Sequence, residues 1–452
     1  MSAIIKAGKA SAPSAPLLAD ADLARAIASR EGRAVAAHDF IAEVLALAAE
    51  LPDGEFVVNL CEDRYRFLVA FCAVAVAGQT NLLPPSRTPQ AIAEVMQAYP
   101  YSRVLCERAL DPPPPRFFRI PPLCNNVESL PPNMPEIALD QIAAIGFTSG
   151  STGAPKANPK TWRALLASSA LNTRLLCRDE IAPNIVATVP PQHMYGLELS
   201  ILLPLCSRAA IHTGHPFFPG DVAHALADVP APRMLVTTPF HLRALMQENI
   251  SLPPLAAIIS ATAPLESGLA ELAEQRHATH VIELFGSTET CVIAHRRTAH
   301  EQAWHLYPGV ELQPQPDGTL VSAPYFSAPT LLHDIVELLP SRCFMLRGRN
   351  GDLLEIAGKR ASLGDLTRRL LAIPGVVDGV VFQLDADANG VGRLAALAVA
   401  DGVVETHILT ALRAAVDPVF LPRPLRLVSQ LPRNRAGKLP RSALLAALGR
   451  EP

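Results

Sequence analysis

Apolar and polar residues follow one another along the chain in patterns that predict strands and helices in turn. Alanine and leucine recur at helical spacing from Asp20 to Leu51, which predicts an amphipathic helix. The apolar run from Glu55 to Leu60 predicts a strand, and the residues from Tyr65 to Ala77 predict a helix. Asn81 to Leu83, followed by two prolines, predicts a strand that runs into a turn. Strands that alternate with helices are typical of parallel α/β layers.

The alternation continues beyond a proline-rich segment, Asp111 to Pro135, which predicts an irregular surface connection. Helices are expected from Thr161 to Leu176, with the threonine as N-cap, and from Asp221 to Leu226. Strands are expected from Ile185 to Val189 and from Met234 to Thr237.

The composition is that of a globular, well-buried protein. The chain has 452 residues, enough for two or three domains, and is 49% hydrophobic and 18% charged. Its most apolar stretch, Phe67 to Gly78, is too short to span a bilayer, and residues 1–16 lack a signal-peptide core, so we expect no membrane span and a cytoplasmic location. The eight cysteines are scattered singly, which argues against a disulfide framework or a zinc ribbon. A net charge of −3 gives no electrostatic case for a nucleic-acid partner.

One loop has the composition of an anion-binding site. It runs Thr148, Ser149, Gly150, Ser151, Thr152, Gly153, Ala154, Pro155, Lys156 and directly follows the apolar stretch 142–147. Glycines let backbone N–H groups turn toward an anion, hydroxyls add donors, and the lysine supplies a full charge. The spacing is not that of a Walker loop, because the lysine follows a proline and precedes an alanine. A nucleoside triphosphate outside the P-loop class is the expected ligand, and a solvated Ser/Gly turn is the alternative.

This loop resembles the phosphate-binding signature of the adenylate-forming superfamily, which includes acyl-CoA synthetases, peptide-synthetase adenylation domains and luciferases. Three further segments match in the family's order. They are Leu284-Phe285-Gly286-Ser287-Thr288-Glu289, Gly348-Arg349-Asn350-Gly351-Asp352 with Gly358-Lys359-Arg360 behind it, and Pro432 to Arg441 with its Gly437-Lys438 pair. Four motifs in order, over roughly residue 60 to the C-terminus, make the resemblance specific.

The resemblance implies an α/β fold with a large N-terminal domain of layered sheets and helices, residues 1–350, and a small mobile α+β C-terminal domain, residues 351–452. It implies ATP and Mg²⁺ as cofactors, a carboxylic acid as substrate, and coenzyme A or phosphopantetheine as the thiol acceptor. Residues 148–156 would hold the β and γ phosphates, Thr288 would contact the α-phosphate, and Glu289 would bind magnesium. Phe285 would stack on adenine, Gly286 and Ser287 beside it would also bind the cofactor, and Asp334 with Arg349 would hold the ribose.

The acid site is implied by two other segments. Pro191-Gln192-His193-Met194-Tyr195-Gly196 resembles the acid-binding segment, so His193 would line the carboxylate pocket. Ala261, Thr262 and Ala263 fall where the family has a glycine-rich turn, and the alanines predict a slightly narrower pocket. Two positions depart from the family pattern: Leu332-His333-Asp334 stands for its usual Thr-Gly-Asp, and Gly351 for the usual Asp or Lys at the domain pivot.

Lys438 is the expected catalytic residue, because the motif around it resembles the one that carries the family's mobile lysine. The sequence therefore predicts ATP-dependent activation of an acid to acyl-AMP, followed by transfer to a thiol. After Asp417 there are seven basic residues against one acidic residue, Glu451. This excess would suit docking of an acidic acyl carrier protein, and a solvated surface is the alternative. The short chain and this basic cluster resemble the ligases of bacterial aryl polyene-type pathways. A luciferase-like or amide-forming enzyme and a non-catalytic adenylate-binding relative are the alternatives.

Overall fold

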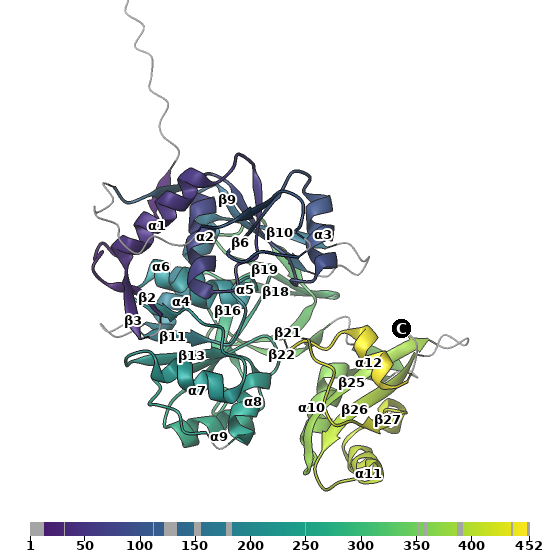
Figure 1. Cartoon of the computed structure of the whole chain (residues 1–452). Coiled ribbons are helices and arrows are strands. Elements are labelled where there is room, and N and C mark those ends of the chain that lie inside the picture. The colour runs from purple at the N-terminus through teal and green to yellow at the C-terminus, as the bar shows by residue number, and fades with distance from the viewer. Residues whose placement is uncertain are drawn as a thin grey trace, which may run out of the picture. The chain divides into compact units, whose positions relative to one another are not determined.

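The computed structural model describes residues 13–30, 32–111, 113–121, 133–148, 155–177, 183–248, 250–349, 353–356, 359–386, 392–434 and 437–449. The chain divides into two compact units. Figure 1 colours the chain by residue number, from purple at the N-terminus to yellow at the C-terminus. The large unit is Met1–Glu301 with Pro324–Ser327, and the small unit is Gln302–Ala323 with Ala328–Pro452. The predicted boundary at residue 350 stays a prediction, and Asn350 to Asp352 lie outside the described residues.

The large unit contains two sheets built mainly from parallel strands. The first has the order β10-β9-β5-β4-β6-β7, in which only β10 and β9 pair antiparallel. Its strands are β10 (Lys156–Thr161), β9 (Ile142–Thr148), β5 (Thr80–Leu83), β4 (Phe56–Asn59), β6 (Arg103–Cys106) and β7 (Phe117–Arg119). The short strands β1 (Ser14–Pro16) and β8 (Glu136–Ala138) form a separate ladder.

The second sheet of this unit runs β16-β15-β14-β13-β11-β12-β2-β3. Strands β15 (Val281–Ser287), β14 (Ala257–Ser260), β13 (Arg233–Thr237), β11 (Asn184–Ala187), β12 (Ala210–His212) and β2 (Ala26–Arg30) are parallel. Strands β16 (Cys291–Arg296) and β3 (Arg33–Ala36) pair antiparallel with β15 and β2. Helices α7 (Pro219–Ala227), α8 (Pro239–Gln247) and α9 (Ser267–His277) pack against it around Leu226, Leu242 and Ala270, and Figure 1 shows them in teal beside β13.

Helix α2 (Arg64–Val76) is buried almost throughout, from Phe67 to Ala75, as its apolar sequence predicts. Helix α4 (Trp162–Leu176) begins where predicted, and the Thr161 hydroxyl accepts a hydrogen bond from Ala164 N at 3.2 Å as its N-cap. The described part of the large unit also contains α1 (Ala37–Glu50), α3 (Pro89–Ala98), α5 (Met194–Leu197), the π-helix η1 (Glu198–Leu202) and α6 (Leu203–Cys206).

One prediction from the hydrophobic pattern was wrong. The helix expected from Asp20 to Leu51 is helical only in α1, because residues 26–36 form the hairpin β2–β3. Gly32, with φ of +71°, allows the hairpin turn, and Ala28 pairs with Ile211 of β12, so sheet pairing overrides helical spacing. The proline-rich segment, expected to be irregular, contains the three-residue strand β7, and residues 122–132 of it lie outside the described residues.

The small unit contains a three-stranded sheet, β25 (Val376–Ala386), β26 (Gly392–Ala400) and β27 (Leu425–Leu427), with apolar side chains on both faces. On one face Val381 and Ala396 pack with helices α10 (Leu363–Leu371) and α11 (Glu405–Ala415). On the other face Phe382 and Leu397 pack with helix α12 (Arg441–Ala447). Adjacent residues thus face opposite cores, as strand geometry requires.

Shorter strands complete the small unit. They are β17 (Trp304–Leu306), β18 (Glu311–Gln315), β19 (Gly318–Ser322), β20 (Thr330–Leu332), β21 (Asp334–Leu339), β22 (Cys343–Arg349), β23 (Leu353–Ile356) and β24 (Lys359–Ser362). Across the described part of both units, no helix combines the length and apolar composition that crossing a bilayer requires.

Candidate active site

The predicted site residues of the large unit follow the carboxyl ends of its parallel strands. His193 lies in the segment after β11, Ala261 to Ala263 directly follow β14, and Phe285 to Ser287 end β15. In open parallel sheets, ligands bind at this edge because the loops that leave neighbouring strands converge there. The topology therefore brings three predicted segments, widely spaced in the sequence, to one edge.

The anion-binding loop connects two paired strands. Thr148, the last residue of β9, lies opposite Lys156, the first residue of β10, so the two strands close the loop at its base. Ser149, Gly150, Ser151, Thr152 and Gly153 lie outside the described residues. The Lys156 side chain is exposed, which suits a charge offered to a ligand.

Thr288 and Glu289 lie in the tight turn between β15 and β16. Ser287 and Cys291 pair across it, and the Ser287 hydroxyl accepts hydrogen bonds at 3.2 Å from the backbone N–H groups of Glu289 and Thr290. At Gly286 a Cβ atom would stand 2.2 Å from the carbonyl oxygen of Cys291, so only glycine fits. The turn is therefore held by the Ser287 hydroxyl and by a glycine that no other residue can replace without movement.

The two hairpins contact each other through Gly146 of β9. A Cβ there would stand 2.8 Å from the Thr288 methyl carbon, so the threonine packs directly on the bare backbone two residues before Thr148. On the neighbouring strand, the buried ammonium of Lys160 donates a hydrogen bond to the carbonyl oxygen of Glu289. The β9–β10 hairpin and the acidic turn are consequently packed against each other.

His193 precedes helix α5 and is half-buried. Its N–H donates to the Pro190 carbonyl at 3.3 Å, and a Cβ on Gly196 would stand 2.0 Å from that same oxygen, so the loop folds tightly onto the helix. The next residue, Met194, approaches Gly146, since its Cε would lie 3.4 Å from a Cβ there. The segment of His193 therefore contacts β9 at Gly146, the residue that Thr288 also contacts.

Arg64 was missed by the sequence analysis. Its fully buried guanidinium donates hydrogen bonds at 2.9 and 2.8 Å to the carbonyls of Ala187 and Val189, which lead into the His193 segment. It also donates to the Ser200 hydroxyl at 2.6 Å, and burial lowers its pKa to about 10. The available signal was an arginine at the start of a helix that is apolar from Phe67 onward.

The Ala261–Ala263 segment is bent sharply at its centre. Thr262 has φ of +82°, a conformation that β-branched residues rarely adopt, while Ala261 is buried and Ala263 exposed. Behind this segment, the buried Glu283 of β15 accepts from Leu265 N at 3.0 Å. Burial raises the pKa of Glu283, although Arg296 pairs with it at 2.7 Å.

The other predicted residues lie in the small unit. Asp334 is buried and lies opposite Arg349 in the antiparallel register of β21 and β22. Two residues that hold one ribose need to be neighbours of this kind. Lys438 is exposed, and its N–H donates to the Asn434 side-chain oxygen at 3.0 Å.

The basic residues expected to form a docking face differ in exposure. The Arg433 side chain is only 15% exposed and pairs with Asp378. Its charge is used within the unit, whereas Arg423 and Arg426 are exposed.

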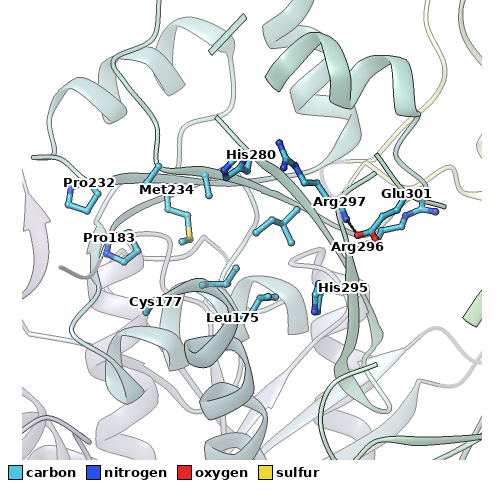
Figure 2. A pocket seen from close by; sticks show the side chains of 14 residues that line it. Leu175, Cys177, Pro183, Pro232, Met234, His280, His295, Arg296, Arg297 and Glu301 are labelled. Atoms are coloured by element: carbon cyan, nitrogen blue, oxygen red, sulfur yellow. Dashed lines mark hydrogen bonds between the residues drawn. The ribbon is translucent and has the colours of Figure 1, made fainter. Parts of the chain in front are cut away.

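A cavity of about 360 Å³ opens in the large unit, and its lining is separate from the predicted site residues. Figure 2 shows Arg296, Arg297 and Glu301 on one side and Pro183 and Pro232 on the other. These prolines precede β11 and β13, so the cavity lies at the amino ends of the parallel strands. It contains none of the predicted site residues.

Comparison with known proteins agrees with this arrangement. The sequence profile described as AMP-binding enzyme matches residues 1–317. The chain belongs to the AMP-binding enzyme family. It is 29% identical over 306 residues to a 4-coumarate–CoA ligase of Rhodobacter capsulatus, covering 65% of this chain and 74% of the relative. It is 24% identical over 364 residues to a sulfoacetate–CoA ligase of Cupriavidus necator, covering 70% and 68%.

Solved structures of this family confirm the predicted fold class. The o-succinylbenzoate CoA synthetase MenE of Bacillus subtilis, in complex with its acyl-adenylate intermediate, matches with a TM-score of 0.80 at 17% identity, covering 96% of this chain and 98% of that one. ATP-bound MatB of Rhodopseudomonas palustris matches with a TM-score of 0.74 at 19% identity, covering 94% and 96%. The amide bond synthetase McbA of Marinactinospora thermotolerans matches with 0.75 at 17% identity, covering 94% and 97%.

Proposed function

We propose that this enzyme is an ATP-dependent acid–thiol ligase. In the first step a carboxylate oxygen bonds to the α-phosphorus of ATP while the bond to pyrophosphate breaks, which gives acyl-AMP. In the second step a thiolate sulfur bonds to the acyl carbon and AMP leaves, the thiol proton passing to solvent. The observation that carries the proposal is the contact between the hairpin that holds Thr148 and Lys156 and the turn that holds Thr288 and Glu289. Gly146 meets the Thr288 methyl group, and Lys160 donates to the Glu289 carbonyl.

The large-unit residues act by positioning and electrostatics, which suffice for phosphoryl chemistry. Residues 148–156 would bind the β and γ phosphates, and Thr288 would donate to the α-phosphate. Glu289, a half-buried carboxylate in a fixed turn, suits Mg²⁺, which prefers one carboxylate with phosphate oxygens and would neutralise developing charge. Phe285, Gly286 and Ser287 would line the adenine site, while His193 and Ala261 to Ala263 would line the acid pocket.

The small-unit residues complete the assignment. Asp334 would accept and Arg349 would donate hydrogen bonds to the ribose hydroxyls, as their pairing across β21 and β22 allows. Lys438 would stabilise the carboxylate and α-phosphate oxygens during adenylation only. The proposal includes a mobile C-terminal domain, residues 351–452, so that Lys438 withdraws before thiol transfer. A cytoplasmic location, where ATP and reduced thiols occur, belongs to the same proposal.

The acceptor is proposed as a pantetheine thiol, carried by coenzyme A or by an acyl carrier protein. The names of the relatives, a 4-coumarate–CoA ligase among them, support coenzyme A and an aromatic acid. The exposed Arg423 and Arg426 support an acidic carrier protein, such as an aryl polyene-type pathway would supply.

Acid-dependent exchange of labelled pyrophosphate into ATP tests the proposal directly. The purified chain is assayed with Mg²⁺, ATP and a panel of benzoates, cinnamates and fatty acids. Exchange that requires an acid supports acyl-AMP formation, and the acid with the highest kcat/KM identifies the substrate class. ATP consumption that produces ADP instead of AMP contradicts it.

A further inference from the structure

Two lysines of β10 share one face of the strand. Lys156 and Lys160 are four residues apart, and the pairing with β9 is regular between them, so both side chains leave the strand on the same side. Lys156 is exposed, but Lys160 is only 7% exposed. Burial of an ammonium is unfavourable unless specific partners compensate for lost hydration.

The buried ammonium has one such partner on the acidic turn. It donates a hydrogen bond to the carbonyl oxygen of Glu289, the proposed magnesium ligand. Because Lys160 contacts the backbone of Glu289, it fixes the position from which the Glu289 side chain extends. It leaves the carboxylate available to a metal ion. Thr288 is fixed at the same time by its packing on Gly146.

Glu198 holds the other side of the turn. It is fully buried, and its carboxylate accepts from Val292 N at 3.1 Å, from the Ser168 hydroxyl at 2.6 Å and from Asn172 at 3.3 Å. Burial raises the pKa of Glu198, while the Ser168, Val292 and Asn172 hydrogen bonds and the charge of Lys160 oppose that rise. Two opposite buried charges therefore hold the backbone of the β15–β16 hairpin, Lys160 at Glu289 in the turn and Glu198 at Val292 in β16.

Buried charge pairs are seldom more stable than apolar residues of the same size, so stability alone does not account for this pair. We propose that Lys160 is a positioning residue that orients Glu289 for the magnesium–nucleotide complex. The inference rests on the proposed function. It assigns the two lysines of β10 different tasks, with Lys156 binding phosphate and Lys160 holding the metal ligand's backbone.

Calorimetric titration with nucleotide tests the proposal without knowledge of the acid. ATP binding is measured in Mg²⁺ and in EDTA for the wild type and for Lys160→Met. We expect Lys160→Met to weaken Mg·ATP binding about tenfold and to change ATP binding in EDTA by less than about twofold. The double variant Lys160→Met with Glu198→Gln removes both buried charges. It replaces Lys160→Met in the titration if the single variant does not fold. Arg297→Met, which breaks the ion pair with Glu274 at the far end of β16, is the matched control.

A double-mutant cycle with Glu289→Gln separates positioning from a general loss of structure. Glu289→Gln alone should weaken Mg·ATP binding, because the amide keeps the shape but lacks the charge that the metal needs. If Lys160 acts through Glu289, adding Lys160→Met to this variant weakens binding by less than about twofold more. If the double variant loses affinity for Mg·ATP by the product of the two single-variant factors, the residues act independently and the inference is overturned. Unchanged Mg·ATP binding by Lys160→Met also overturns it. A wild type that binds no Mg·ATP refutes the proposed function itself.

Discussion

The guanidinium of Arg433 pairs with both carboxylate oxygens of Asp378, at 2.9 and 3.0 Å. Asp378 belongs to β25, in the central sheet of the small unit, and Arg433 also donates to the Gly437 carbonyl at 3.0 Å. Gly437 immediately precedes Lys438, which is exposed. The pair therefore ties the loop of the proposed catalytic lysine to a rigid strand.

Lys438→Ala should separate the two half-reactions. Because its charge is proposed to act only in the first transition state, the variant should lose several orders of magnitude in acyl-AMP formation. Thiolation of supplied acyl-AMP should stay within about threefold of the wild type. Both rates are measured by single-turnover quench, with Arg413→Ala, at an exposed position of α11 in the same unit, as the control. Equal losses in both steps would sink the assignment of Lys438.

Charge reversal at Arg423 and Arg426 should test the carrier-protein acceptor. If these exposed side chains form the docking face, Arg423→Glu with Arg426→Glu slows transfer to an acidic carrier about tenfold at low salt, since like charges then oppose encounter. The effect should diminish at high salt, and transfer to a small neutral pantetheine analogue should be unchanged. Carrier loading at the wild-type rate in low salt would leave coenzyme A as the proposed acceptor.

Gly286→Ala should destabilise the large unit because its Cβ meets the backbone of the facing strand at 2.2 Å. We expect a loss of about 3 kcal/mol in the free energy of unfolding, measured by urea denaturation. The matched substitution is Gly268→Ala in helix α9, where a Cβ meets nothing within 4 Å. That variant should gain about 0.5 kcal/mol. Similar stabilities for the two variants would show that the turn after β15 is not tightly packed.

Glu43 should make stability depend on pH. Burial raises its pKa to about 7 from an ordinary value of 4.5, although Tyr65 donates a hydrogen bond to it. Because the folded state binds the proton more tightly, stability is highest below about 4.5 and falls as pH rises to about 7. Glu43→Gln should remove this slope and raise stability at pH 8 by about 1–2 kcal/mol, after allowance for solvent screening.

Urea unfolding at pH 5, 6, 7 and 8 checks this prediction about Glu43. Glu50→Gln, at an exposed position of the same helix, is the control. A slope that survives in Glu43→Gln would place the titrating group elsewhere.

The motif residues of the proposed site could be named from the sequence alone, because residue type and local spacing define a motif, and their roles stay predictions. Thr161 as an N-cap and the apolar helix α2 were predictable for the same reason. Lys160 and Glu198 were not predictable, since their contacts with Glu289 and Val292 depend on the packing of a second sheet and of a helix against the β15–β16 hairpin. The hairpin β2–β3 was missed because its partner strand, β12, lies far along the chain.

Isotope transfer tests the central claim, adenylation of a carboxylic acid, most directly. The acid that best supports pyrophosphate exchange is labelled with ¹⁸O in its carboxylate and incubated with Mg·ATP and a thiol acceptor, and the nucleotide product is analysed by mass spectrometry. Attack by the carboxylate on the α-phosphorus predicts AMP that carries one ¹⁸O atom, formed only when the acid is present. Unlabelled AMP, or ADP with the label in inorganic phosphate, would contradict the account.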